Sequence, residues 1–409
     1  MPRSYAVLHW NSNQEKTAGN PKLRRLQADR DCRFPKQHWK GNRTPVVFVV
    51  PELDQDIDNA LIHADFKRLR TLCTRVGITL DSYAKIPVTA CPGASTEAWR
   101  HCQPLVGAEL ARLDPVVVIP YGPKATQSVV GRYWQQPAEL YDRWYGQKIP
   151  CRDLNAWICP VGLPATHKGQ GDISTMFAFR WLRDAIRITK RPWEKPIIEP
   201  RTLVKSVYNS SEINNLLAHI ANTAEYSAFD YETTGLKPEW DTHEIVSVSI
   251  AWVESGEVKC IAFPLFSDCV SALKAYLQSP GKKIAANMKF EERWSYKKLG
   301  VRVRNWYWDT MQAAHWENPM EGITGLKFQA FARLGIPYFA EDVEQYFDAP
   351  SNAERNKIHQ VAMPALLTYN GIDAISELLL ASVQMVENEI ISQHFVPDKY
   401  LPTCLNPSS

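Results

Sequence analysis

Two acidic residues separated by one position occur in the second half of the chain, at Asp230 and Glu232, within the sequence DYETTGL of residues 230–236. Alternate residues of a strand point to the same face, so both carboxylates are expected to project together. Like charges held that close repel each other unless a cation lies between them. The pair is only weak evidence of a metal site by itself, because an exposed strand face also explains it.

Two later segments add acids and a phenol. The sequence NMKFE at 287–291, which leads from a strand predicted at 283–286 into a helix, supplies Glu291. In YNGID at 369–373, Tyr369 and Asp373 are four residues apart, so on a helix they share one face. Asp309, in WDTM at 308–311, is interpreted instead as the N-cap of a helix.

Taken together, these segments supply enough carboxylates for two divalent cations, which lie about 4 Å apart in two-metal sites. The acids are Asp230, Glu232, Glu291 and Asp373. Hard oxygen ligands favour Mg²⁺ or Mn²⁺ over Zn²⁺. Two such ions would stabilise the attacking and leaving oxygens of an in-line phosphoryl displacement.

The segment from about residue 203 to 390 resembles the 3′–5′ exonuclease domain of DNA polymerase I, one of the ribonuclease-H-like, DnaQ-type exonucleases with four acids and a tyrosine. Its three motifs correspond to residues 230–236, to residues 287–291 and to Tyr369-x-x-x-Asp373. Residues 309–311 and 325–327 look like family segments between the second and third motifs. The second motif usually ends in Asp, so Glu291 puts the rate and the metal preference in question.

This resemblance implies a mechanism. Asp230, Glu232 and Asp373 would bind one metal, Asp230 would bridge to a second, and Glu291 would hold the second partly through water. Tyr369 and Glu232 would orient the water that attacks the last phosphodiester, releasing nucleoside 5′-monophosphates. Leu236 resembles the residue that wedges beside the terminal base, with Phe339 as its stacking partner or, alternatively, as a packing residue. The substrate contacts that the resemblance implies are Thr233, Leu236, Asn287, Phe290 and Phe339.

The elements that position these residues form a mixed α/β domain. Strands are predicted at 226–232, 244–253 and 258–264, as a β-meander. A helix at 211–221 is expected to begin at an N-cap of Ser210 or Ser211. Further helices are predicted near 270–277, 291–298, 309–317, 325–334 and 362–390.

The first half of the chain alternates apolar strands, at 46–50 and 115–120, with helices, which predicts an α/β layer with a parallel sheet. The helices are expected at 60–76, 105–113, 125–130 and 175–189. Residues 190–202 contain three prolines and are the predicted linker. The predicted organisation is a basic segment 1–45, a domain 46–189, the linker, an exonuclease domain 203–395 and a tail 396–409.

The net charge of +3 hides two opposite halves. Residues 1–190 hold 27 Lys and Arg against 17 Asp and Glu, a net of +10, and residues 191–409 hold 20 against 27, a net of −7. A basic half suggests contact with a polyanion. Trp134, Tyr141, Trp144 and Tyr145, interleaved with Arg132 and Arg143, would either stack on bases or pack in the core.

Residues 46–170 resemble the scaffold of the uracil-DNA glycosylase superfamily, closest to its iron–sulfur branch, which implies a three-layer α/β fold. The similar stretches are Cys91, 102–105, 109–110, 113–118 and 122–131. The active-site motifs depart from the family, because residues 50–53 read VPEL and Leu163-Pro164 stands in place of His-Pro. Losing the histidine that stabilises the uracil anion removes a large electrostatic contribution. We therefore expect a basic module for nucleic-acid or partner contact, without glycosylase activity.

The same branch carries an iron–sulfur cluster on four cysteines. The corresponding residues here are Asp29, Cys32, Cys91 and Cys102, and three thiolates with one carboxylate could still bind a cluster. Three ordinary cysteines in a degenerate site is the preferred interpretation. No signal peptide or membrane span is evident, and the nine scattered cysteines predict reduced thiols, so a cytoplasmic protein is expected, in a host cytoplasm if the origin is viral.

The leading hypothesis is a Mg²⁺- or Mn²⁺-dependent 3′–5′ exonuclease acting on DNA 3′ ends, single-stranded or at a primer terminus. Because the chain ends about 35 residues after Asp373, the polymerase domain of the resembling family is missing, which suggests proofreading with a separate DNA polymerase. The alternatives are a ribonuclease-D-like RNA exonuclease, a non-catalytic DNA-binding or polymerase-scaffolding protein, and a glycosylase.

Overall fold

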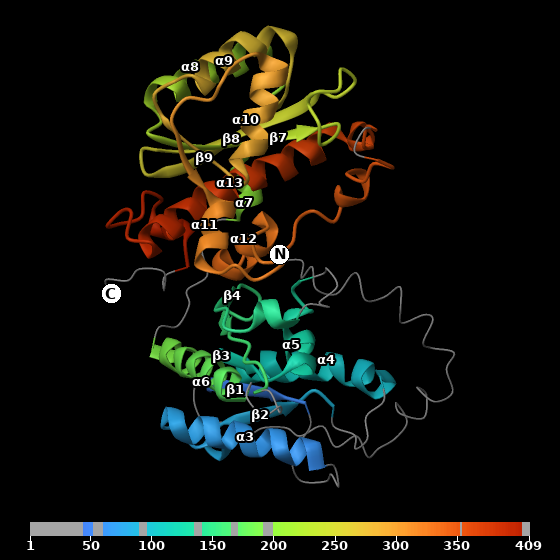
Figure 1. Ribbon diagram of the computed structural model, residues 1–409, viewed down its shortest axis with the longest axis vertical. Coiled ribbons are helices and arrows are strands. Elements are labelled where there is room, and N and C mark those ends of the chain that lie inside the picture. The colour runs from blue at the N-terminus through green and yellow to red at the C-terminus, as the bar shows by residue number, and fades with distance from the viewer. Residues whose placement is uncertain are drawn as a thin grey trace. The chain divides into compact units, whose positions relative to one another are not determined.

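The computed structural model describes residues 44–51, 60–89, 96–134, 141–164, 171–190, 199–351 and 354–402. The chain divides into two compact units, Met1–Trp193 and Glu194–Ser409, each of which is described by itself (Figure 1). Most of the predicted basic segment, the linker residues 191–198 and the tail residues 403–409 lie outside the described residues.

The first unit contains a five-stranded sheet in the order β2-β1-β3-β5-β4. Neighbouring strands are parallel except for β4, which runs antiparallel to β5 at the edge. The predicted α/β class is confirmed. The strands are β1 Thr44–Val50, β2 Ala84–Pro87, β3 Pro115–Pro120, β4 Ile149–Cys151 and β5 Ala156–Ile158, and the helices are α3 Ala60–Val76, α4 Thr96–Leu113, α5 Pro123–Val130 and α6 Gly171–Arg187.

The buried side chains of the first unit explain why these segments are ordered. Residues 46–50 of β1 are all at most 2% exposed, as expected of a central parallel strand covered on both faces. Helix α4 begins at Thr96, well before the predicted residue 105, and continues through Pro104. A proline removes one backbone hydrogen bond. The buried row of Cys102, Val106 and Leu110 passes across that position and holds the helix together.

Two aromatic residues considered for base stacking belong to this core. Trp134 and Trp144 are 2% and 0% exposed, and their rings meet edge to face with centroids 5.5 Å apart. The Arg143 guanidinium lies 5.1 Å from the centre of the Trp144 ring. Packing, not base stacking, is therefore the correct interpretation of both tryptophans.

The second unit is built on a six-stranded mixed sheet in the order β11-β10-β7-β8-β9-β6. The antiparallel β7-β8-β9 meander is confirmed, and β10 and β11 continue the sheet in parallel beyond β7. The order and directions of these strands are those of a ribonuclease-H-like fold, as predicted. The strands are β6 Val204–Ser206, β7 Tyr226–Thr233, β8 Ile245–Glu254, β9 Glu257–Pro264, β10 Lys282–Ala285 and β11 Trp306–Asp309.

Two helices of this unit begin near residues that were predicted as N-caps. The N-cap of α8 is Asn209, whose side chain accepts a hydrogen bond from the Glu212 amide, so the predicted cap at Ser210 or Ser211 was wrong by one or two residues. The predicted cap at Asp309 is confirmed. The helices are α7 Pro200–Leu203, α8 Ser210–Thr223, α9 Val270–Leu277, α10 Met288–Trp294, α11 Thr310–Glu317, α12 Leu326–Leu334 and α13 Met363–Glu387, and a π-helical turn, Ser295–Leu299, continues α10.

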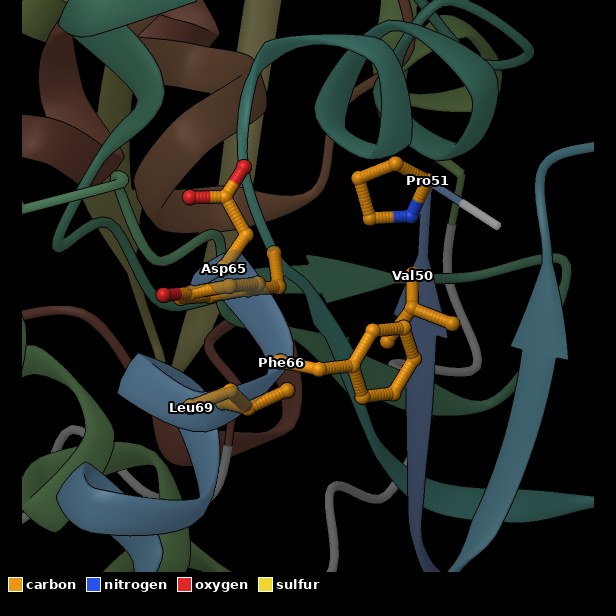
Figure 2. Close-up of a pocket in the computed structure, with 6 residues that line it drawn as sticks. Val50, Pro51, Asp65, Phe66 and Leu69 are labelled. Carbon is orange, nitrogen blue, oxygen red and sulfur yellow. The ribbon is translucent and has the colours of Figure 1, made fainter. Parts of the chain in front are cut away.

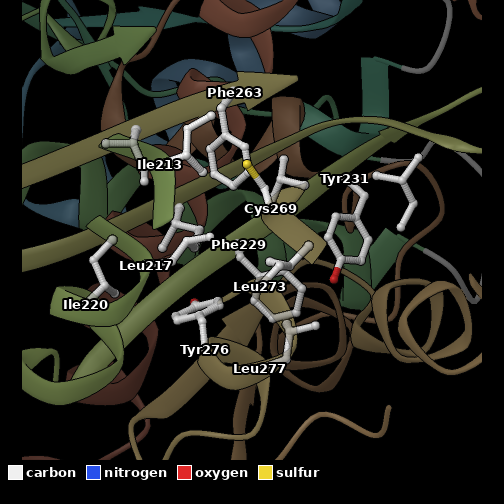
Figure 3. Packing of buried hydrophobic residues seen from close by; sticks show 14 of the residues in the cluster. Ile213, Leu217, Ile220, Phe229, Tyr231, Phe263, Cys269, Leu273, Tyr276 and Leu277 are labelled. Atoms are coloured by element: carbon white, nitrogen blue, oxygen red, sulfur yellow. The ribbon is translucent and has the colours of Figure 1, made fainter. Parts of the chain in front are cut away.

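Alternation along β7 decides which way its acids point. Phe229 and Tyr231 belong to the core that the sheet forms with α8 and α9 (Figure 3). Ala228, of the opposite parity, packs in the core that contains α13. Asp230 and Glu232 share the parity of Ala228, so they lie on the α13 side of the sheet.

Helix α13 crosses this face of the sheet and is buried almost all round, with every residue from Tyr369 to Val386 in the interior. A helix that is buried on all sides is typical of the centre of a domain. At Gly371 a Cβ atom would lie 2.5 Å from the Val204 side chain, so glycine is needed for α13 to approach β6 this closely. In the described parts of the chain, no helix is both long and apolar enough to span a bilayer.

Candidate active site

Three carboxylates from two elements meet at the end of β7. Asp230 and Glu232 come from the strand and Asp373 from α13, and one oxygen of each lies within 4.8 Å of the others. Glu232 and Asp373 are 9% and 2% exposed. The structure thus brings together residues that are 141 positions apart in the sequence, from Glu232 to Asp373.

Burial makes this cluster electrostatically unfavourable as three anions. Burial, and then the charge of Asp373, raises the pKa of Asp230 to about 8. The pKa of Glu232 is raised well above its usual value by burial and then by Asp230. Such carboxyl groups retain protons at neutral pH unless a positive charge replaces them. The cluster therefore has the properties of a cation site.

One cation of the protein itself reaches the cluster, from α12. The Lys327 ammonium donates a hydrogen bond to Asp373 Oδ2 at 2.7 Å and lies 4.7 Å from the centre of the Tyr369 ring. Burial lowers the pKa of Lys327, but Asp373 and the other acids raise it by more, so the ammonium stays charged. Lys327 belongs to the segment 325–327 that resembles the family, but its contact with the acids was not predicted from the sequence.

Tyr369 lies one helical turn before Asp373 on α13, as its spacing predicted. Burial, followed by the charge of Asp373, raises its pKa, so the hydroxyl keeps its proton at neutral pH. Two phenylalanine rings flank the Tyr369 ring, Phe339 at 5.7 Å and Phe347 at 5.4 Å between centroids. Of these two, Phe347 lines the cleft described below and Phe339 packs in the core, so Phe347 is the aromatic residue that the sequence analysis missed.

A polar chain on the same face of the sheet orients Asp230. The Asn370 side-chain amide donates to Asp230 Oδ2 at 2.7 Å, and the Ser247 hydroxyl donates to Asn370 Oδ1 at 3.1 Å. A second hydroxyl, that of Ser249, donates to the Asn370 backbone carbonyl at 2.8 Å. Asn370 and Ser247 are fully buried, so this arrangement fixes the carboxylate from behind.

The hydrogen bond from the Asn370 amide to Asp230 leads to a prediction for Asn370→Ala. Without the amide, Asp230 loses its fixed orientation, and we expect divalent-cation affinity or nuclease activity to fall about 10–100-fold, as when outer-shell partners of metal ligands are removed. The measurement is Mn²⁺ titration together with nucleotide release. Ser249→Ala is the matched control, because it removes a hydroxyl that contacts only the backbone of residue 370. Equal losses in both variants would contradict a specific role for the amide.

Asp309 connects the second motif to the sheet. Its carboxylate accepts from the Met311 and Gln312 amides, as the N-cap of α11, and also from the Asn287 and Met288 amides, each at 3.0 Å. One side chain therefore ties together the starts of α10 and α11. Asn287 itself adopts a left-handed conformation with φ of 66° and is absent from the residues that line the cleft.

Glu291, on the first turns of α10, lies apart from the three-carboxylate group. It is 2% exposed, and its Oε2 has no hydrogen-bond partner among the described residues. Burial, and then the charge of Asp230, raises its pKa well above the usual value. Glu291 is thus close enough to Asp230 for the charge of one to affect the other.

A cleft of about 450 Å³ opens in front of the three acids. Leu236, 62% exposed, projects beside it, and the Thr233 hydroxyl donates to the Gly235 carbonyl, which fixes the turn after β7. The volume suits a small ligand or one nucleotide unit. The lining includes Asp230, Glu232, Thr233, Leu236, Phe290, Lys327, Phe347, Asn356, Tyr369 and Asp373.

The first unit offers a much smaller space. Residues from β1, α3 and the end of β3 surround a cavity of about 10 Å³ (Figure 2). The cavity has room for about one water molecule and is too small for a base. Its lining residues are Val50, Pro51, Asp65, Phe66, Leu69 and Tyr121.

The proposed cluster ligands in this unit are mostly outside the described residues. Cys102 is buried in α4, whereas Asp29, Cys32 and Cys91 lie outside the described ranges. The iron–sulfur question and the resemblance to a glycosylase therefore stay predictions.

A comparison with known protein families finds a match for part of the second unit. A family model described as 3′-5′ exonuclease matches residues 204–350, which include β7 and α10 but end before α13. A search of the curated proteins gave no match.

Solved structures with partial similarity include polymerases and ribonucleases. The POL domain of Pol1 from M. smegmatis, in complex with DNA primer-template and dNTP, is 16% identical with a TM-score of 0.32, over 46% of this chain and 28% of that chain. Escherichia coli RNase D is 14% identical with a TM-score of 0.35, over 46% and 45%. Brucella melitensis NrnC with bound Mg²⁺ is 16% identical with a TM-score of 0.29, over 46% and 81%. These similarities are too distant to carry a functional assignment, and the chain spans less than half the length of the first two.

The donor set fits Mg²⁺ or Mn²⁺. All the donors are carboxylate oxygens, the ligands that these hard cations prefer. Asp373 Oδ1 and Glu291 Oε2 are buried without a partner among the described residues, and such oxygens are costly unless a cation or a proton satisfies them. Residues 204–350 of the second unit therefore match a 3′-5′ exonuclease family, and Asp230 and Glu232 of that segment, with Asp373 beyond it, form a carboxylate group suited to a divalent cation.

Proposed function

We propose that this protein is a metal-dependent 3′–5′ exonuclease that releases nucleoside 5′-monophosphates from DNA 3′ ends. The observation that carries the proposal is the meeting of Asp230, Glu232 and Asp373 within 4.8 Å, beside a cleft of nucleotide size. The match of residues 204–350 to the 3′-5′ exonuclease family supports it. The net charge of +10 on residues 1–190 favours attraction of a polyanionic substrate.

The acids divide into two groups by position. Asp230, Glu232 and Asp373 would hold one divalent cation, and Glu291 would approach a second beside Asp230. Cations bound there supply positive charge to the attacking and leaving oxygens of an in-line phosphoryl displacement. Asn370 and Ser247 hold Asp230 in place during the reaction.

The remaining residues act on water and substrate. The Tyr369 hydroxyl keeps its proton, interacts with the Asp373 carboxylate and lines the cleft, and with the Glu232 carboxylate it would orient the attacking water. Leu236, Phe290 and Phe347 offer apolar surface to the terminal base and sugar. Lys327 offsets negative charge at Asp373 until substrate and cations arrive.

Proofreading alongside a separate polymerase is the finer form of the proposal. It rests on the resemblance to DNA polymerase I, and no contact of the described residues bears on it. A substrate of RNA is the competing outcome, because the carboxylates act on the phosphodiester in either nucleic acid.

The test uses 5′-labelled single-stranded DNA and RNA of one sequence, with the full chain and Mg²⁺, Mn²⁺ or EDTA. We expect a ladder of DNA shortened from the 3′ end with either metal, slower shortening of RNA, and intact substrates in EDTA. The released product is identified as nucleoside 5′-monophosphate by chromatography. Faster trimming of RNA would replace DNA by RNA as the substrate, and intact substrates with every divalent metal would overturn the proposal.

A further inference from the structure

A run of basic side chains follows the first turn of α10. Residues 293–304 contain five Lys or Arg and no Asp or Glu, although residues 191–409 carry a net charge of −7. Clustered Lys and Arg along a helix are the electrostatic mark of a nucleic-acid contact. Four of these side chains are exposed: Arg293, Lys297, Arg302 and Arg304.

The same helix forms part of the rim of the cleft. Phe290, on the first turn of α10, lines the cleft. One turn later, the Arg293 guanidinium donates two hydrogen bonds to the Glu239 carboxylate, at 2.8 and 2.6 Å. Glu239 lies only three residues after Leu236, which also lines the cleft. The surface around this ion pair is therefore continuous with the mouth of the cleft.

Trp240, next to Glu239, is anchored to this surface through its backbone. The Lys298 ammonium donates to the Trp240 carbonyl at 2.8 Å, and the His243 amide donates to the same oxygen at 3.0 Å. The residue is nevertheless 47% exposed. An aromatic ring that is accessible on a fixed backbone is suited to stacking on a nucleic-acid base.

Tyr296 and its cationic neighbours continue the surface along the π-helical turn. Tyr296 is 46% exposed, and its ring centre lies 4.3 Å from the Arg302 guanidinium and 5.7 Å from the Lys297 ammonium. Arg302 also donates to Glu292 at 3.1 Å. Lys297 and the exposed Lys289, by contrast, form no ion pair among the described residues. These two ammonium groups are therefore available to bind phosphates.

We propose that single-stranded DNA leading to the cleft lies across this surface, which we call the α10 track. The track consists of Lys289, Trp240, Tyr296, Lys297 and Arg302. Trp240 stacks on a base that precedes the 3′-terminal nucleotide, and Lys289 and Lys297 contact phosphates. The inference rests on the proposed function for the direction of the strand and for the choice of DNA.

The charge of the unit explains why such a track is needed. An acidic unit repels a polyanion, so a local strip of positive charge is required where the strand approaches the cleft. The 7 residues of α10 and the 5 of the π-helical turn span roughly 18 Å, the length of roughly five stacked nucleotides. A substrate of two nucleotides is thus too short to use the whole track, and one of ten nucleotides covers it.

The test measures binding of a labelled ten-nucleotide thymidine oligomer to the full chain in EDTA, by fluorescence anisotropy over a range of salt concentrations. The double variant Lys289→Ala/Lys297→Ala should bind about tenfold or more weakly at low salt. Its slope of log K against log salt should be smaller by about 1.4, the value for two lost phosphate contacts. Trp240→Ala should bind about fivefold or more weakly with an unchanged salt slope, because it loses stacking only.

The matched control removes two positive charges elsewhere on the same unit. Arg201→Ala/Lys274→Ala changes α7 and α9, neither of which contributes a residue to the cleft lining. This control should bind as wild type does. An equal loss of affinity in both double variants would mean that only the overall charge matters, and would overturn the track.

Cleavage of two-nucleotide and ten-nucleotide substrates separates this inference from the function beneath it. Wild-type KM should fall about tenfold or more from the shorter to the longer substrate, and Lys289→Ala/Lys297→Ala should lose most of that gain. No cleavage by wild type with any divalent metal would overturn the proposed function, whereas the anisotropy in EDTA would still decide the track. Wild-type affinity and salt slope in Lys289→Ala/Lys297→Ala would overturn the track even in an active nuclease. Tighter binding of a uridine oligomer of the same length would overturn DNA as its occupant.

Discussion

Asp230→Asn is expected to lower nucleotide release by about 10³-fold or more while leaving the protein folded. Asp230 is the acid that the proposed site uses twice, once with Glu232 and Asp373 and once beside Glu291. A bound cation stabilises the transition state by several kcal/mol, and each 1.36 kcal/mol lost corresponds to a tenfold change in rate. The measurement is kcat and KM on labelled single-stranded DNA, with a thermal melt of each variant.

Asparagine is the informative substitution at this position because it keeps the shape and can still accept from the Asn370 amide. Removing one of several crowded anions should leave the metal-free protein as stable as wild type or more stable. Asp268→Asn is the matched control, since Asp268 is exposed on the same unit, away from the cleft-lining residues. A variant that kept more than a tenth of wild-type activity would show that Asp230 does not hold a catalytic cation.

The parts of the site that follow from local periodicity were predictable. Strand alternation placed Asp230 and Glu232 on one face, and helical spacing did the same for Tyr369 and Asp373. Which face of the sheet α13 covers was not encoded in either segment alone. It depends on how Phe229 and Tyr231 pack with α8 and α9, which leaves the opposite face for α13.

The residues that the sequence did not reveal are those whose role is set by distant contacts. Glu377 meets the Ala286 amide across 91 positions, and Asn370 meets Asp230 across 140. In the sequence, Glu377 is one acid in a long helix, and an exposed position is the usual expectation for such a residue. Lys327 contacts Asp373 only because α12 packs on α13.

The boundaries of helices and strands were also predictable only where the local sequence pattern is long enough. Long apolar or periodic segments such as α3 and β3 lie where predicted. The strands β4, β5 and β6 have three residues each, too few for a recognisable period, and were not predicted. Asn209 was missed as the cap of α8 because the two serines that follow it are equally good capping residues.

Without metal, the thermal stability of this protein should fall as pH rises from 5 to 8. The pKa of Asp230 is raised to about 8 by burial and then by Asp373, and those of Glu232, Glu291 and Glu377 are raised as well. An unfolded Asp titrates near 3.9. Across this window the folded state therefore binds more protons than the unfolded chain, so the free energy of unfolding decreases with pH.

The size and the metal dependence of this effect make it measurable. A loss of about 2 kcal/mol lowers Tm by about 4–8 °C for a unit of this length. We expect a fall of about 5 °C or more between pH 5 and pH 8 in EDTA. With millimolar Mn²⁺ the fall in Tm should disappear. The cation binds the ionised carboxylates of the folded state, and protons compete with it less as the pH rises.

Lys283 and the Asp230→Asn variant both affect how the pH dependence of Tm is read. Burial, and then Arg304, lowers the pKa of Lys283 to about 8, which adds stability only as pH rises above 8, so the chosen window avoids the opposing effect. Asp230→Asn removes one buried carboxyl and should flatten the pH dependence in EDTA, with a higher Tm than wild type at pH 8. A Tm in EDTA that is independent of pH in wild type would mean that the acids are already neutralised within the protein. The carboxylates would then not need a cation to compensate their charge, and the proposed metal-dependent reaction would lose its electrostatic basis.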